Sequence, residues 1–71
     1  MNKNKIEKLT ENDPVLKKLK EERVFDLSAD EDTNTIDFVE MCDQWFWVGL
    51  NQNEVEHLGK LFCEIAEEMK Q

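Results

Sequence analysis

The chain has few of the residues that build phosphate loops, zinc sites or disulfide frameworks. Its 71 residues include two glycines, one proline, one histidine and two cysteines, and no tyrosine. Phosphate loops need closely spaced glycines, and structural zinc sites need cysteine and histidine pairs at short spacing. Neither pattern occurs. We therefore expect no cofactor, no metal ion and no catalytic residues, so an enzyme is the weakest class of function.

Long apolar runs are also missing. No stretch approaches the roughly 20 apolar residues needed to span a membrane, and residues 1–20 lack a continuous apolar stretch like that of a signal peptide. These absences predict a cytoplasmic protein, in the host cytoplasm if the chain is viral, with no membrane partner. In a reducing cytosol Cys42 and Cys63 are expected to be small buried hydrophobic residues, while a disulfide between them stays an alternative.

One short stretch resembles a metal site. Asp30 to Asn34 resembles the start of an EF-hand calcium loop, because oxygen-bearing side chains occupy the first, third and fifth positions. The pattern then fails, since the sixth position is Thr35 instead of glycine and the twelfth is Met41 instead of glutamate. We predict a solvated acidic loop. His57 lies among charged residues and is expected to face solvent.

Net charge is the property of the whole sequence that says most about its partner. There are 17 acidic and nine basic residues, for a net charge of −8, and residues 24–71 hold twelve of the acids and only two of the bases. Such a field repels nucleic acid and anionic lipid and attracts basic protein surfaces, so the expected partner is a protein with a basic surface and direct nucleic-acid binding is not expected. The alternative is that the acids only keep the chain soluble. The predicted partner-binding acids are Asp26, Asp30, Glu31, Asp32, Asp37, Glu40 and Asp43.

Helical spacing marks two segments. Asp13 can cap a helix that starts with Pro14, so a short helix is predicted over residues 14–22. Asn51 and Glu54 form a capping-box pattern that predicts the start of a longer amphipathic helix. Residues 1–12 are expected to be a flexible or partly helical arm, and residues 13–71 a single domain. The apolar stripe of the longer helix is predicted to be Val55, Leu58, Leu61, Phe62, Ile65, Ala66 and Met69.

Period-two patterns between the helices predict strands. The strands are expected over residues 24–27, 35–42 and 45–50, with a polar loop over residues 28–34 and a turn at Asp43 and Gln44. The predicted fold class is therefore α+β: a short N-terminal helix, a three-stranded antiparallel sheet, and a long C-terminal amphipathic helix packed on the sheet.

This register gives the sheet two apolar faces. The C-terminal helix is expected to cover the face that carries Val39, Met41, Phe46, Val48 and Leu50. The opposite face carries Ile36, Phe38, Cys42, Trp45 and Trp47 around Glu40. Either the short first helix covers this second face, or the face is a homodimer or partner interface anchored by Phe38, Trp45 and Trp47.

Two functions follow as hypotheses. Short acidic domains without motifs are the usual form of inhibitors encoded by phages or mobile elements, of antitoxins and of immunity proteins. The leading hypothesis is a non-enzymatic inhibitor, of anti-CRISPR or anti-restriction type, that imitates nucleic acid and binds a basic nucleic-acid-handling host protein. The alternative is an adaptor, assembly or antitoxin-like module, homodimeric or not, that interacts through the aromatic sheet face.

Overall fold

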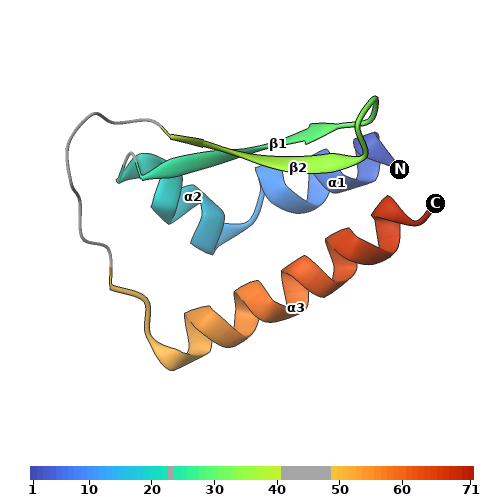
Figure 1. Ribbon diagram of the computed structural model, residues 1–71. Helices are drawn as coiled ribbons and strands as arrows, with labels where there is room; N and C mark the ends of the chain where they lie inside the picture. The colour runs from blue at the N-terminus through green and yellow to red at the C-terminus, as the bar shows by residue number, and fades with distance from the viewer. Residues whose placement is uncertain (23, 41–48) are drawn as a thin grey trace.

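The computed structural model describes residues 1–22, 24–40 and 49–71 (Figure 1). Its elements follow the order α1, α2, β1, β2, α3. The two strands form an antiparallel hairpin, and the helices lie on one side of it (Figure 1). The class is α+β. The bounds are α1 (Lys3–Glu11), α2 (Pro14–Glu21), β1 (Phe25–Asp30), β2 (Thr35–Glu40) and α3 (Gln52–Met69).

Both N-terminal helices begin at side-chain caps. Asp13 Oδ1 accepts hydrogen bonds from the backbone N–H groups of Val15 and Leu16, each at 3.0 Å, and Pro14 occupies the first turn, as predicted. Residues 1–12 were predicted to be a flexible or partly helical arm. They contain the helix α1. This helix carries Ile6, whose side chain is only 1% exposed, so α1 contributes to the core.

Helix α3 begins at the predicted capping box. Asn51 Oδ1 accepts from the Glu54 N–H at 2.9 Å, and Glu54 Oε1 accepts from the Asn51 N–H at 3.0 Å. The helix buries a narrower stripe than predicted, because Leu61 and Ile65 are buried while Phe62 is exposed. The reason is that α3 packs mainly on α1 and α2 instead of lying across the sheet.

The sheet differs from the prediction in its extent. Strand β1 continues through Asp30, so the connecting loop is residues 31–34 and not 28–34. Asn34 closes this loop at φ 55°, a left-handed conformation that asparagine tolerates. The sheet has two strands in the described residues. The predicted turn at Asp43 and Gln44 lies outside these residues, as does the predicted third strand except for positions 49 and 50, which are in neither a strand nor a helix.

The prediction that the C-terminal helix covers the Val39 face of the sheet was wrong. Strand register places Ile36 opposite Ala29 and Phe38 opposite Leu27, and these four residues share the face that packs toward the helices. Val39 lies on the other face and is 48% exposed. The cause is β1, whose apolar side chains alternate with polar ones and therefore select this face.

The core joins all three helices to β1. Partly buried side chains of β2 and of the chain ends surround it, including Ile36 and Met69. The short helix α2 therefore covers part of the Ile36 face, as one of the two alternatives predicted. The buried residues that form the core are Ile6, Leu16, Leu19, Ala29, Leu61 and Ile65.

A second contact of Asp13 fixes α3 against α2. Asp13 is 6% exposed and is the buried polar residue of the described segments. Its Oδ2 contacts Nε2 of His57 in α3, while Oδ1 caps α2. His57 was expected to face solvent, and its side chain is 43% exposed, but it is also held by the contact with Asp13.

Replacing Asp13 should destabilise the fold. We expect Asp13→Ala to lower the free energy of unfolding by about 1 to 2 kcal/mol, because the α2 cap is lost, and the contact to His57 is lost with it. Asp13→Asn is the matched control, since asparagine caps helices equally well. Urea unfolding followed by circular dichroism measures both variants, and equal stability of Asp13→Ala and wild type would contradict the role given to this carboxylate.

Candidate partner-binding surfaces

The β1–β2 hairpin gathers four of the seven predicted acids at its connecting end. Asp30 and Asp37 lie on the strand face that points away from the helices, and Glu31 and Asp32 lie in the loop between the strands. We call these four residues the acidic hairpin tip. Glu40 is opposite Phe25 at the other end of β2, and Asp43 lies outside the described residues.

Hydrogen bonds within the acidic hairpin tip divide its carboxylates into two roles. Asp30 Oδ1 accepts from the N–H groups of Asp32 at 3.0 Å and Thr33 at 3.4 Å, so Asp30 builds the turn. Asp37 Oδ1 accepts from the Thr35 hydroxyl at 3.3 Å. The side chains of Glu31 and Asp32 are exposed, and they present their carboxylates to solvent.

The acidic hairpin tip gathers carboxylates that have no counter-charge among the described residues. In residues 1–22, 24–40 and 49–71, none of its four carboxylates joins an ion pair. Asp26, predicted to share the surface, instead lies 3.4 Å from Lys20 Nζ. The other pairs of carboxylate and ammonium groups are Lys3–Glu7, Lys5–Glu68, Lys18–Glu54 and Lys70–Glu67.

Glu54 shows what such pairing does to a carboxyl group. The pKa of Glu54 is lowered from its ordinary value, first because its carboxylate accepts the Asn51 N–H and then because Lys18 Nζ lies 3.1 Å away. The same contacts join α2 to the first turn of α3.

A row of three aromatic rings lies on the other side of the hairpin. The ring centroids of Phe25 and Phe38 are 5.3 Å apart, and those of Phe38 and Phe62 are 6.4 Å apart, both edge to face. We call these rings the phenylalanine row. Phe38 is 60% exposed. The other two predicted aromatic anchors, Trp45 and Trp47, lie outside the described residues.

Sequence reasoning missed two members of the phenylalanine row. Phe25 was assigned to a strand but not to a face, although its alternation with Leu27 and Ala29 carries that signal. Phe62 was assigned to the stripe that α3 buries. The register between β1 and β2 brings Phe25 next to Phe38, and the packing of α3 brings Phe62 to the same ring.

Cys63 differs from its prediction. The side chain is a free, exposed thiol, because position 63 lies on the opposite side of α3 from Leu61 and Ile65. Cys42 lies outside the described residues. Among the residues that the structure describes, no group of histidine, cysteine and acidic side chains is placed to hold a metal ion.

The arrangement defines a small α+β domain with the acidic hairpin tip on one side and, on the other, the phenylalanine row, in which Phe38 and Phe62 are exposed. No helix in the described ranges has the length and apolar character to cross a membrane. The chain matches no protein-family model, and neither curated proteins nor solved structures give a match. Function must therefore be argued from these surfaces.

The lowered pKa of Glu54 implies that its contribution to Tm depends on pH. A carboxyl with a lowered folded-state pKa stabilises the fold above the ordinary pKa, here 4.5, and this contribution is lost as the pH falls through the folded-state pKa. We expect Glu54→Gln to lower Tm at neutral pH and the difference from wild type to shrink below pH 4.5. Glu64→Gln, at an exposed position of α3, is the control. A Tm difference for Glu54→Gln that stays constant with pH would contradict this.

Proposed function

We propose that the protein is a non-enzymatic inhibitor that binds the basic surface of a nucleic-acid-handling protein through the acidic hairpin tip. The observation that carries the proposal is that this tip gathers four carboxylates on one hairpin, none of which joins an ion pair in the described residues. A basic groove that normally binds phosphates would accept such a surface in place of nucleic acid.

The construction of the hairpin supports this role. Asp30 fixes the turn through two backbone N–H groups, so Glu31 and Asp32 are held in a defined place. The hairpin is anchored to the helices by Ala29, Leu27 and Ile36 on its other face. Pre-organised charges lose less conformational entropy on binding than charges on a flexible tail. The net charge of −8 adds long-range attraction to a basic partner.

The source of such a protein follows from the same proposal. An acidic inhibitor of nucleic-acid-handling proteins suits a phage or mobile element that must block host defence, as an anti-CRISPR or anti-restriction protein does. The site of action would then be the host cytoplasm.

Charge reversal at the acidic hairpin tip tests the proposal. Immobilised wild-type protein and the double variant Glu31→Lys/Asp32→Lys are used to capture proteins from host lysate, followed by elution in rising salt. We expect a nucleic-acid-binding protein on the wild-type resin and an affinity at least about tenfold lower for the variant, because complementary charges across an interface are replaced by like charges. Asp30 is left intact because its carboxylate holds the turn.

The matched control is Glu56→Lys/Glu64→Lys, which makes the same charge change at exposed positions of α3. This variant should retain the partner. The purified partner should also lose nucleic-acid binding when equimolar wild-type protein is added. Equal loss of capture by both double variants, or a captured partner whose nucleic-acid binding is unaffected, would refute the proposed inhibition.

The phenylalanine row favours one second candidate, an adaptor or assembly module, and the salt dependence of binding distinguishes the two candidates. Phe38 is 60% exposed, and exposed aromatic residues are common anchors of interfaces. We expect Phe38→Ala to weaken self-association or partner binding by about 2 kcal/mol with little salt dependence. Sedimentation equilibrium measures self-association. Val39→Ala, on the opposite sheet face, is the control, and an unchanged association constant for Phe38→Ala would exclude this candidate.

A further inference from the structure

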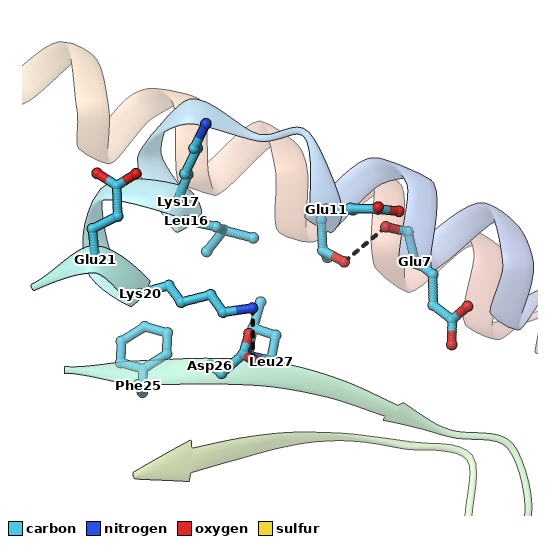
Figure 2. A pocket seen from close by; sticks show the side chains of 10 residues that line it. Glu7, Glu11, Leu16, Lys17, Lys20, Glu21, Phe25, Asp26 and Leu27 are labelled. Atoms are coloured by element: carbon cyan, nitrogen blue, oxygen red, sulfur yellow. Dashed lines mark hydrogen bonds and ion pairs between the residues drawn. The ribbon is translucent and has the colours of Figure 1, made fainter. Parts of the chain in front are cut away.

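A groove runs along the edge of β1 that does not pair with β2. A cavity of about 780 Å³ lies between β1 and the two N-terminal helices (Figure 2). A smaller cavity of about 100 Å³ continues along the strand, and both cavities are lined by Glu7, Thr10 and Leu27. Together they border the strand from Phe25 to Ala29.

The residues that line the larger cavity identify it as lying at a strand edge. Side chains on one face of a strand alternate, so a cavity over a face would be lined by every second residue. Here the consecutive residues Phe25 to Leu27 line the larger cavity. The smaller cavity is lined by Ile36 of β2 as well as by β1, so it reaches under the sheet. In the described part of the chain, β1 pairs only with β2. The groove therefore gives access to the unpaired backbone of β1.

One backbone N–H of β1, that of Leu27, bonds to a side chain. The Leu27 N–H donates to the carboxylate of the neighbouring Asp26 at 2.8 Å. Lys20 Nζ lies against the same carboxylate at 3.4 Å (Figure 2). An added strand could supply a carbonyl to Leu27, and Asp26 would then be released to pair with a cationic side chain of that strand.

The walls of the groove define the chemistry of its occupant. Leu16, Phe25 and Leu27 supply apolar surface. Glu7 and Glu11 of α1, Glu21 of α2 and Asp26 supply four carboxylates, against the two ammonium groups of Lys17 and Lys20. Lys20 is paired with Asp26, and Glu7 with Lys3. The carboxylates of Glu11 and Glu21 then stand against the one ammonium group of Lys17, and this excess of negative charge favours a cationic ligand.

We propose that the groove binds an extended segment of a partner protein, with basic and apolar residues in alternation, as an added strand on β1. Main-chain hydrogen bonds to the strand edge supply affinity in this mode, and alternate side chains supply specificity. Apolar side chains of the segment contact Leu16 and Leu27, and basic ones contact the surrounding carboxylates. This site is distinct from the acidic hairpin tip and stands without the proposed inhibition.

The probe is a fluorescein-labelled octapeptide of alternating arginine and valine, titrated with the full-length protein and followed by fluorescence anisotropy. A second peptide has the same sequence with N-methyl groups on alternate backbone nitrogens, so it keeps its charge and loses the N–H groups that pair with a strand. We expect the unmethylated peptide to bind at least tenfold more tightly.

Two variants locate the binding in the groove. Glu11→Lys/Glu21→Lys should weaken binding at least tenfold, and Lys20→Ala should tighten it about threefold because Asp26 loses its cation. Loss of folding cannot imitate a tighter complex, and circular dichroism checks the fold of each variant. The matched control Glu56→Lys/Glu64→Lys should change the affinity much less than the groove variant.

Several outcomes would overturn the proposal. Absence of peptide binding, equal affinity of the two peptides, or equal weakening by the control variant would show that no strand is added in this groove. Weakening by Glu31→Lys/Asp32→Lys as large as that by Glu11→Lys/Glu21→Lys would place the peptide at the acidic hairpin tip. Self-association of wild type that is abolished by Glu11→Lys/Glu21→Lys would make a second copy the occupant instead.

Discussion

The carboxylate of Asp13 fixes the position of α2, and the arrangement of the other helices depends on it. One oxygen accepts two N–H groups at the start of α2 and the other contacts His57 in α3. A buried carboxylate is tolerated only with such partners, because its desolvation is otherwise costly. No buried side-chain polar atom within the described ranges lacks one. With α2 held in this way, Leu16 and Leu19 reach the core, and the outer side of the same helix becomes one wall of the groove along β1.

The charge asymmetry along the sequence acquires a structural meaning in this arrangement. Lysines of the N-terminal helices contact acids of later elements, as Lys5 does with Glu68 and Lys18 does with Glu54. The first 23 residues hold most of the cations, and the helices bring several of them to the acids of α3 and β1. The hairpin extends past α2 (Figure 1). Its tip keeps free carboxylates because none of those described lysines lies within ion-pair distance of them.

Local features of the fold were predictable from sequence, and long-range ones were not. The caps at Asp13 and Asn51 depend on side chains within three residues, so their patterns identified α2 and α3. The contact between Asp13 and His57 spans 44 positions, and no local pattern reveals it. The Val39 face was wrongly predicted to lie under the C-terminal helix, because the covered face depends on how β1 registers with β2. The acids of the hairpin tip were predicted from the sequence. The pairing of Asp26 with Lys20 was not, because it depends on how α2 packs on β1.

The acidic hairpin tip and the β1 groove would act on different properties of one partner. Free charges at the tip act over a Debye length of about 8 Å at physiological salt, so they favour encounter with a basic surface without fixing its register. The strand edge acts only at hydrogen-bond distance, and it fixes direction and register through the backbone. Because β1 ends at the tip and borders the groove along its length, a basic segment drawn to the tip would lie next to the edge that can pair with it. Selectivity among basic proteins would then come from the presence of an extended segment beside their nucleic-acid-binding surface, a property that charge alone does not distinguish.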